Sequence, residues 1–206
     1  GMSESGIIPF THTFACFASR KCIDQIFLSA CYSRLNVKMI GTDGAICSAT
    51  NGGSHQGMED MGILNSLNNI TLIDMTDSVM LKKLLPVIKD EYGVVYFRIY
   101  RRGENVVYGE NSEFTIGKGN ILVEGTDATV IASGIEVPEA LEAAELLAAE
   151  GIHIRVVDMF TWRPLDKELI IDCAEKTGAI VTAENHCIAS GLGHAVSAVV
   201  AEECPV

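Results

Sequence analysis

The chain has 206 residues, of which 48% are hydrophobic, and its formal net charge is −12. A composition this apolar can form a substantial core and excludes an intrinsically disordered chain. The negative charge argues against nucleic acid or an anionic membrane as a partner, because both bind basic patches. No apolar run is long enough to span a bilayer, and no signal peptide is visible.

The seven cysteines are odd in number, and none is spaced as in CxxC or another zinc site. Most of them lie in apolar patterns, where a free cysteine behaves as a small buried hydrophobe. We therefore expect a reducing, cytoplasmic compartment.

The first half of the chain alternates predicted strands with predicted helices. The expected strands are 7–13, 37–41, 71–74 and 94–99, and the expected helices are 14–35 and 78–89. Another helical pattern follows Gly53, with apolar residues at Met58, Met61, Leu64 and Leu67. Glycines 52 and 53 permit a sharp turn, and Ser54 can cap the helix that follows.

This pattern puts His55 in the first turn of a predicted helix, at the end of a loop. The free N–H groups and the positive dipole end of such a helix suit anionic ligands. A histidine there can transfer a proton or hydrogen-bond an oxygen-rich substrate. The alternative is that His55 only caps the helix and faces solvent.

The periodicity fades over 103–119, which predicts a linker and two domains, 1–112 and 113–206. The second half then has expected strands at 121–124, 129–132, 153–158 and 179–183, and expected helices at 138–150, 165–177 and 195–203. Alternation of this kind predicts two three-layer α/β/α domains with mostly parallel sheets. We expect the first domain to be incomplete at its N-terminus and the second to be truncated at its C-terminus. The glycines at 191 and 193 lack the spacing of a nucleotide fingerprint and predict a tight turn into a helix.

Three loops follow predicted strands in the first half, namely 14–17, 42–55 and 98–102. In open parallel sheets, ligands bind beyond the carboxyl ends of the strands. The shared location of these loops favours a functional role for His55 over simple capping.

With these loops in place, nearly the whole chain resembles the C-terminal part of a transketolase. The order and spacing of several short motifs carry the resemblance: 7–10, 52–56, 96–98, 129–137, 155–159 and 180–186. The chain most resembles the bacterial split form, in which one chain carries the diphosphate-binding domain and another carries the two domains predicted here. The resemblance implies transfer of a two-carbon ketol unit between sugar phosphates, as in the pentose phosphate pathway.

The resemblance also implies roles for individual residues. Phe14 and Phe17 match the aromatic positions that stack on the aminopyrimidine ring of the cofactor. Thr11 replaces a further aromatic residue of some members, which leaves that side of the ring pocket thinner. Without the resemblance, core phenylalanines on an amphipathic helix explain the pair equally well.

His55 matches the histidine that contacts substrate oxygens, and Arg98, assisted by Arg101, matches the arginine that binds the substrate phosphate. The alternative for the arginines is a solvated strand end. Asp43 replaces a histidine of typical transketolases, and Asn51 replaces an aspartate, so we expect a shifted substrate preference. Asp43 should favour a hydroxyl-rich or cationic neighbour such as an arginine, unless it only caps a turn before Gly44.

The cofactor implied by the family is thiamine diphosphate, with Mg²⁺ held by a separate domain or chain. The family's cofactor-activating glutamate would lie upstream of Gly1, so we expect this chain to be inactive alone. The expected partners are an N-terminal diphosphate-binding subunit or domain and a second copy of the C-terminal part. The alternatives are a deoxyxylulose-phosphate synthase-like protein, a 2-oxo acid dehydrogenase beta-like subunit, or a non-catalytic assembly module.

Overall fold

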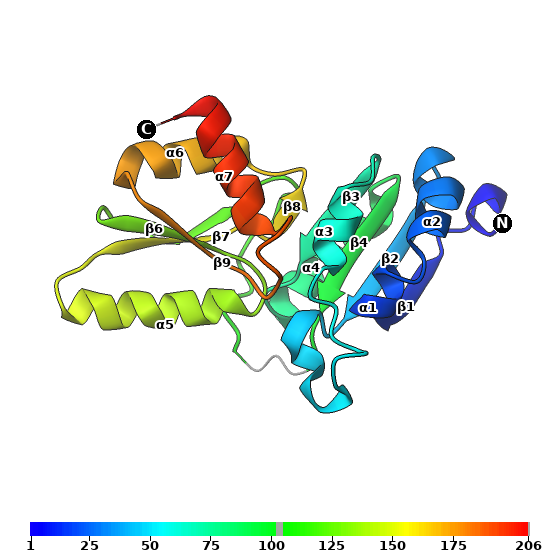
Figure 1. The fold of residues 1–206 in the computed structure, drawn as a ribbon, viewed down its shortest axis with the longest axis horizontal. Coiled ribbons are helices and arrows are strands. Elements are labelled where there is room, and N and C mark those ends of the chain that lie inside the picture. The colour runs from blue at the N-terminus through cyan, green and yellow to red at the C-terminus, as the bar shows by residue number, and fades with distance from the viewer. Residues whose placement is uncertain (102–104, 206) are drawn as a thin grey trace.

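The computed structural model describes residues 1–101 and 105–205 and contains two β-sheets (Figure 1). In the first sheet, four parallel strands lie in the order β1-β2-β4-β3, and an antiparallel fifth strand, β8, pairs with β3. These strands are β1 (Phe10–Phe14), β2 (Val37–Thr42), β3 (Ile70–Asp74), β4 (Val94–Ile99) and β8 (Thr161–Arg163). In the second sheet the order is β5-β7-β6-β9, and only the β5–β7 pair is antiparallel. Its strands are β5 (Asn120–Val123), β6 (Ala128–Ala132), β7 (Ile154–Asp158) and β9 (Ile180–Ala183).

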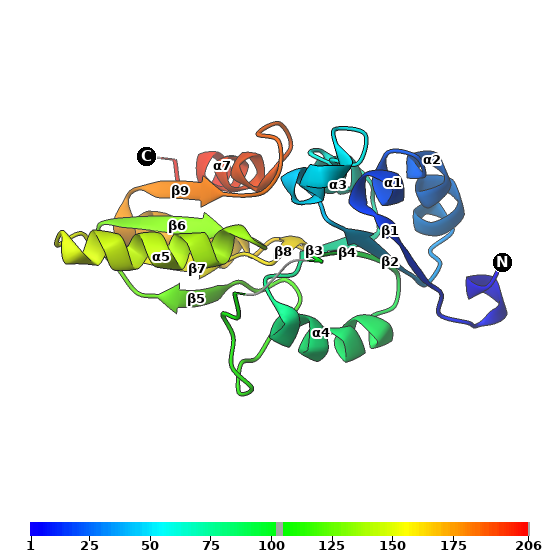
Figure 2. The same ribbon diagram turned by 90° about the horizontal axis from the view of Figure 1, so that it is seen from below.

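Helices cover both faces of each sheet, as the expected three-layer α/β/α arrangement requires (Figures 1 and 2). Helix α4 lies on one face of the first sheet, with α1 and α3 on the other, and α5 lies across the second sheet from α6 and α7. The α-helices are α1 (Ala15–Ser19), α2 (Ile23–Gln25), α3 (Asp60–Asn65), α4 (Ser78–Asp90), α5 (Glu136–Ala149), α6 (Lys167–Thr177) and α7 (Leu192–Glu203). A π-helical segment spans Ile26–Tyr32, and 3-10 segments span Ser3–Ser5 and Ala45–Asn51.

The register of the first sheet brings the carboxyl ends of its four parallel strands to one edge. Phe14 pairs with Thr42, Thr42 pairs with Ile99, and Asp74 pairs with Arg98. The loops that follow these strands therefore meet at that edge, as expected for a parallel sheet.

Strand β8 is a feature that the sequence pattern does not reveal. It lies in the second half of the chain, beyond the expected division at 112/113, yet it hydrogen-bonds to β3 of the first sheet. The Asp74 N–H also donates to the Phe160 carbonyl oxygen (2.8 Å). Three residues are too few to show a strand periodicity, so only the tertiary structure identifies β8.

The helix predicted after Gly53 begins later than expected. Its first residue is Asp60, and the Ser54 hydroxyl contacts His55 Nδ1 (2.9 Å) and does not cap a helix. A Cβ on Gly57 would lie 2.9 Å from the backbone nitrogen of Cys16, so the loop is drawn against α1 at this point. The prediction that His55 occupies the first turn of a helix is wrong, because α3 begins only at Asp60.

The single helix predicted over 14–35 is also wrong, because the chain leaves helical geometry at Cys22 (φ −116°, ψ 4°). The short α1, α2 and the π-helical segment replace it. The other predicted helices form within a few residues of their expected bounds, and Asp77 caps α4 by accepting the Met80 N–H (2.8 Å).

One hydrophobic cluster contains side chains from both halves of the chain. It joins Leu72 and Tyr96 of the first sheet to Val157 and Trp162 of the second half, all nearly inaccessible to solvent. This shared core couples the two sheets. Within the described residues, no helix has both the length and the apolar character needed to cross a membrane.

Candidate functional site

An aromatic cluster of Phe14, Phe17 and His55 lies at the carboxyl edge of the first sheet. The ring centre of His55 lies 5.1 Å from each phenylalanine ring, and the two phenylalanine rings lie 6.0 Å apart, edge to face. Phe14 ends β1, Phe17 lies in α1, and His55 reaches them from the loop after β2. All three side chains are half-buried, so each keeps surface for a ligand.

His55 is oriented by its neighbour. Its Nδ1 shares a hydrogen bond with the Ser54 hydroxyl (2.9 Å), and its ring packs edge-on against both phenylalanines. Among the described residues, Nε2 has no hydrogen-bond partner, so it is the ring nitrogen free to meet a ligand. A histidine held in this way can donate or accept a proton at Nε2.

An ion pair of Asp43 and Arg101 borders the aromatic cluster. The Asp43 carboxylate accepts hydrogen bonds from the Arg101 backbone N–H (3.0 Å) and from its guanidinium Nε. The guanidinium lies 5.1 Å from the ring centre of Phe14, within cation–π range. Asp43 is buried, whereas the Arg101 side chain is 54% exposed. The arginine neighbour expected for Asp43 is therefore present, and Arg101 keeps open surface beside the aromatic rings.

Arg98 has surroundings that differ from those expected of a phosphate-binding residue. Its side chain is fully buried, and it pairs with Asp60 (Nε to Oδ2, 2.9 Å) and Asp74 (Nη1 to Oδ2, 3.5 Å). Its Nη1 also donates to the Asn185 carbonyl oxygen (3.0 Å). The guanidinium has no solvent-accessible face to offer a substrate phosphate, because protein carboxylates and a carbonyl occupy its donors.

Burial and the Arg98 guanidinium shift the pKa values of the two carboxylates in opposite directions. Burial alone raises the pKa of Asp60, but the adjacent guanidinium and hydrogen bonds from Arg98 and Tyr96 outweigh it and hold that pKa below its usual value. For Asp74 burial dominates and raises the pKa, although Arg98 and the Tyr100 and Ser133 hydroxyls oppose it. Asp60 also makes the closer contact to the guanidinium (2.5 Å, against 3.5 Å for Asp74), so it is the main counter-ion of Arg98.

The sequence analysis missed Asp60 and Asp74 as partners of Arg98. A signal for them exists, because Tyr96, Arg98 and Tyr100 alternate along one face of the β4 strand and its extension. A buried arginine on such a strand needs an acidic partner. The Tyr96 hydroxyl donates to Asp60 and the Tyr100 hydroxyl to Asp74, both at 2.6 Å. The pattern predicts acidic partners without indicating which acids they are.

Asn51 is exposed in the 3-10 segment on the loop that carries His55. Its amide oxygen lies 3.4 Å from the Thr50 hydroxyl. The structure thus brings Phe14, Phe17, His55, Asp43 and Arg101 together, while Asn51 is exposed on the loop that carries His55 and Arg98 lies in the interior.

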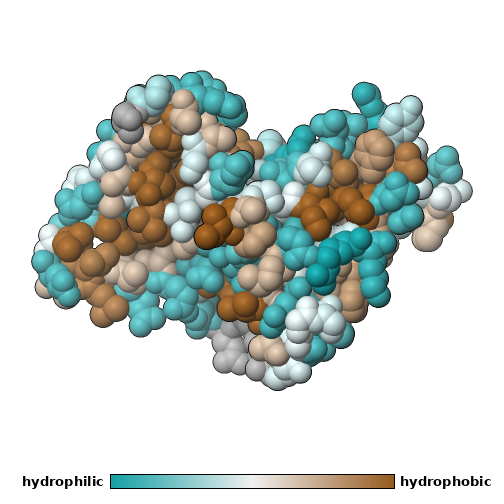
Figure 3. Space-filling view, in the orientation of Figure 1, coloured by the Kyte–Doolittle hydropathy of each residue, from teal (hydrophilic) through white to brown (hydrophobic). Residues whose placement is uncertain are grey.

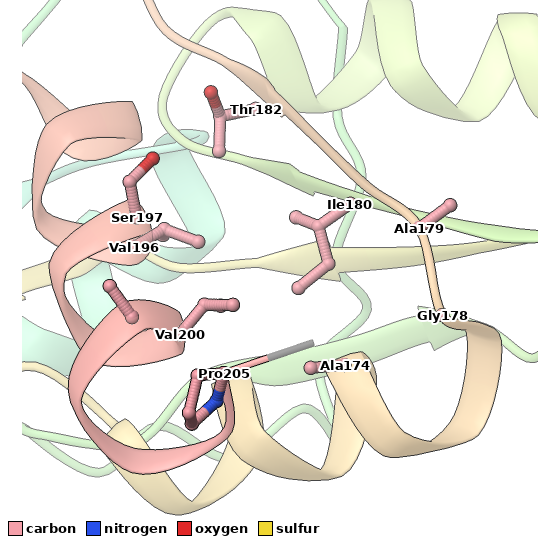
Figure 4. Close-up of a pocket in the computed structure, with 10 residues that line it drawn as sticks. Ala174, Gly178, Ala179, Ile180, Thr182, Val196, Ser197, Val200 and Pro205 are labelled. Atoms are coloured by element: carbon pink, nitrogen blue, oxygen red, sulfur yellow. The ribbon is translucent and has the colours of Figure 1, made fainter.

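A cavity of about 510 Å³ lies between β9, α6 and α7. Its lining residues are distant in sequence from those of the aromatic cluster. Val196 and Val200 of α7 face Ile180 of β9 across it (Figure 4). It adjoins an apolar band over β9, between α5 and α7 (Figure 3). Among the described residues that line it, none has an ionisable side chain, so they offer no acid–base chemistry.

The described residues contain no cluster of three or more His, Cys, Asp or Glu side chains that could hold a metal ion.

The fold and the edge geometry define an α/β protein of two sheets whose candidate ligand site is formed by loops beyond parallel strands. Residues 1–103 match the transketolase pyrimidine-binding domain, and residues 117–206 match the transketolase C-terminal domain. The chain belongs to the transketolase family, whose members depend on thiamine diphosphate.

Two relatives and one solved structure illustrate the similarity. A 6-deoxy-6-sulfo-D-fructose transketolase subunit from Clostridium sp. (strain MSTE9) is 46% identical over the whole chain, which covers 64% of that relative. An apulose-4-phosphate transketolase subunit from Phocaeicola vulgatus is 34% identical over 94% of the chain, which covers 62% of that relative. A split-gene transketolase, described as an inactive beta4 tetramer, superimposes with a TM-score of 0.92 at 40% identity, over 100% of this chain and 67% of that one. The chain thus spans less than two thirds of the length of both relatives.

Proposed function

We propose that the chain is the C-terminal part of a thiamine-diphosphate-dependent transketolase that transfers a two-carbon ketol unit between sugar phosphates. The observation that carries this proposal is the arrangement of Phe14, Phe17 and His55 beside Arg101 at one sheet edge. An aromatic platform, a histidine and an exposed cation are the groups needed to hold a flat heterocycle, a hydroxylated carbon chain and a terminal anion.

The residues at this edge fit the aminopyrimidine ring of thiamine diphosphate. Phe14 and Phe17 are half-buried and present apolar ring surface next to each other, which suits stacking or edge-on packing of a heterocycle. When bound, the cofactor supplies an electron sink for cleavage of the ketose carbon–carbon bond. We propose that its diphosphate and Mg²⁺ are held by another domain or chain.

The proposed substrate contacts follow from exposure and charge. His55 hydrogen-bonds substrate oxygens and moves a proton through Nε2, since Nδ1 is engaged by Ser54. Arg101, in place of the buried Arg98, binds the terminal anion of the sugar, and Asp43 fixes the direction of its guanidinium. The exposed Asn51 meets a sugar hydroxyl as a neutral amide. The site therefore selects for that hydroxyl less strongly than it would with a carboxylate at this position.

The proposed assembly contains an N-terminal diphosphate-binding partner and a second copy of this part. Support comes from the relatives named as transketolase subunits and from the split-gene neighbour named as an inactive beta4 tetramer. We propose that this chain is likewise inactive without its partner. We also propose two domains that divide after residue 112 and a cytoplasmic location, for which the seven free cysteines are the support.

The test is ketol transfer by the complete assembly with thiamine diphosphate, Mg²⁺, a phosphorylated ketose donor and an aldose phosphate acceptor. His55→Ala should lower kcat about a hundredfold, because a positioned proton-transfer group is lost. Ser54→Ala is the matched control: it removes only the orienting hydrogen bond and should cost far less. Absence of ketol transfer by the wild-type assembly, or an unchanged kcat for His55→Ala, would contradict the proposal.

A sulfonated ketose is a second candidate donor, because the 46% identical relative is named for a sulfo-sugar. Asp43 already offsets the charge of Arg101, so the site carries little net positive charge. A singly charged sulfonate would meet less repulsion from Asp43 than a phosphate, which carries about −1.5 to −2 charges near neutral pH. Comparison of kcat/KM for the 6-sulfo and 6-phospho forms of the same ketose decides between the two anions.

A further inference from the structure

The loop that carries His55 is closed at its base by a backbone hydrogen bond, and other segments of the chain hold it in place. It runs from Gly44 to Met58 between β2 and α3, and its base is closed by a hydrogen bond from the Ala45 N–H to the Gly57 carbonyl oxygen (3.0 Å). A single backbone hydrogen bond does not fix a loop of this length in space. Residues of and next to α1 contact the middle of the loop, because Cys16 Sγ and the Arg20 guanidinium lie 3.7 and 3.5 Å from the Ser54 carbonyl oxygen. The anchors at its two ends come from the second half of the chain.

Asn185, just after β9, supplies the anchor at the start of the loop. Its side-chain oxygen accepts the Ile46 N–H (3.3 Å), and its amide nitrogen donates to the Gly44 carbonyl oxygen (3.0 Å) and towards Cys47 Sγ (3.3 Å). Asn185 is only 4% exposed, so water does not compete with these contacts. Both ends of one amide are thus used to hold the loop backbone.

The next two residues hold the other end of the loop and the first turn of α3 behind it. The Cys187 N–H donates to the Met58 carbonyl oxygen (2.7 Å). His186 Nε2 accepts the Gly62 N–H at 3.1 Å, while its Nδ1 lies 2.7 Å from the Cys187 carbonyl oxygen, which sets the neutral tautomer with the proton on Nδ1. We call residues 185–187 the clamp, because they contact both ends of the loop that carries His55.

The clamp is itself fixed in place. Glu184, immediately before it, accepts the N–H groups of Leu192 (2.6 Å) and Gly193 (2.8 Å) at the start of α7. A Cβ on Gly191 would lie 2.2 Å from a Glu184 carboxylate oxygen, so glycine is needed for this close approach. The buried Arg98 holds the Asn185 carbonyl oxygen (3.0 Å). The loop is therefore anchored to a rigid point and not to another mobile segment.

We infer that Asn185 is a positioning residue that sets the place of His55 against Phe14 and Phe17, so that the second half of the chain controls the geometry of the site. This inference rests on the proposed function of His55. Asn185 touches neither His55 nor the aromatic rings, and it acts through the loop backbone. Because catalysis depends on the placement of groups to within about 1 Å, a released loop should lower turnover without abolishing the fold.

The test compares Asn185→Leu, which keeps the size of the side chain and removes its hydrogen bonds, with Arg163→Met. Arg163 is the matched control, because its Nη1 also joins the two halves (2.6 Å to the Asn65 carbonyl oxygen), but at the far end of α3. In the complete assembly with cofactor, Asn185→Leu should lower kcat roughly tenfold to a hundredfold, with a smaller change in KM. Arg163→Met should leave kcat within about twofold of wild type. An equal loss in both variants would overturn the inference.

A double-mutant cycle separates positioning of His55 from a general structural effect. If Asn185 acts through His55, Asn185→Leu should cost little further kcat when His55 is already alanine. A full and independent loss in that background would overturn the inference. If Asn185→Leu fails to fold, Asn185→Asp takes its place, since it keeps the acceptor for the Ile46 N–H and sets an oxygen against the Gly44 carbonyl.

Amide hydrogen exchange provides a readout that does not depend on activity. In Asn185→Leu, the amides of residues 45–58, and that of Ile46 above all, should exchange at least tenfold faster than in wild type, while Arg163→Met leaves them unchanged. Unchanged exchange in Asn185→Leu would overturn the inference. If the loop amides respond as expected but the wild-type assembly transfers no ketol unit, the proposed function fails and the clamp stands.

Discussion

At the scale of residues, Arg98 and Arg101 show how position on a strand decides the role of a charge. Arg98 lies within β4 and points into the interior, where Asp60 neutralises it. Arg101 lies beyond the end of the strand and keeps an exposed side chain. The sequence predicts the arginine cluster and its edge of the sheet. It does not predict which arginine is buried, because the carboxylates that decide this lie far away in the chain.

Arg101→Met should weaken binding of substrates that carry a terminal anion. The change removes the cation beside Phe14 and also takes the guanidinium partner from the buried Asp43, so the free energy of unfolding is measured alongside the kinetics. We expect KM for phosphorylated sugars to rise about tenfold or more, as for loss of a charged hydrogen bond of roughly 1.5–3 kcal/mol. Steady-state kinetics with phosphorylated and unphosphorylated substrates measure this, and an equal rise for both types would refute an anion-binding role.

Arg98→Met should instead act on stability. It leaves Asp60 buried without its counter-ion, which should lower the free energy of unfolding by about 3–5 kcal/mol. The double change Arg98→Met with Asp60→Asn removes both charges and should recover part of that loss. Urea unfolding of the three proteins measures the difference. A single variant as stable as wild type would show that the buried pair contributes nothing to folding.

At the scale of elements, the sequence predicts the apolar strands well and the site loop poorly. Strand β4 forms over the predicted residues, because its continuous apolar run is typical of a strand buried on both faces. The helix expected at Ser54 does not form there, although its apolar residues are spaced for it. Contact of Gly57 with α1 and of residues 185–187 with the loop decides that geometry, and neither contact has a local signal.

Gly57→Ala should disturb the site through this contact. The added Cβ would lie 2.9 Å from the Cys16 nitrogen and 3.1 Å from its Cα, so backbone must move. We expect a loss of about 1–3 kcal/mol in the free energy of unfolding, as for overpacking, together with reduced kcat. Gly53→Ala is the matched control in the same loop, because its Cβ would meet nothing within 4 Å. Similar behaviour of the two variants would refute the role given to the close approach.

At the scale of the whole molecule, the two halves are joined more closely than a linker between two domains suggests. Strand β8 completes the first sheet, one hydrophobic cluster spans both sheets, and Thr76 of the first half donates to Asp158 of the second. The sequence predicts two α/β units from their alternating elements. It does not predict their union, because the contacts that create it pair residues about a hundred positions apart or join short segments without periodicity.

Asp158 makes the contacts between the two halves of the chain sensitive to pH. It ends β7, fully buried, and its Oδ2 accepts the Thr76 and Tyr108 hydroxyls, while Oδ1 has no partner among the described residues. Burial raises the pKa of Asp158 to about 7, although both hydroxyls oppose the shift. Between its unfolded pKa and about 7, the folded state therefore binds more protons than the unfolded state. The contribution of Asp158 to stability therefore falls as pH rises through this window.

Asp158→Asn should remove this pH dependence, because an amide keeps the shape and an acceptor oxygen but cannot ionise. The difference in the free energy of unfolding, variant minus wild type, should grow by roughly 2–3 kcal/mol as pH rises from about 5 to about 8. Urea unfolding of both proteins at the two pH values measures the gain. Asp74, whose pKa burial also raises, is present in both proteins, and its charge is one of the causes that raise the pKa of Asp158. Parallel pH profiles for wild type and variant would mean that Asp158 does not change its protonation on folding, and that the junction between the two halves is insensitive to pH at this residue.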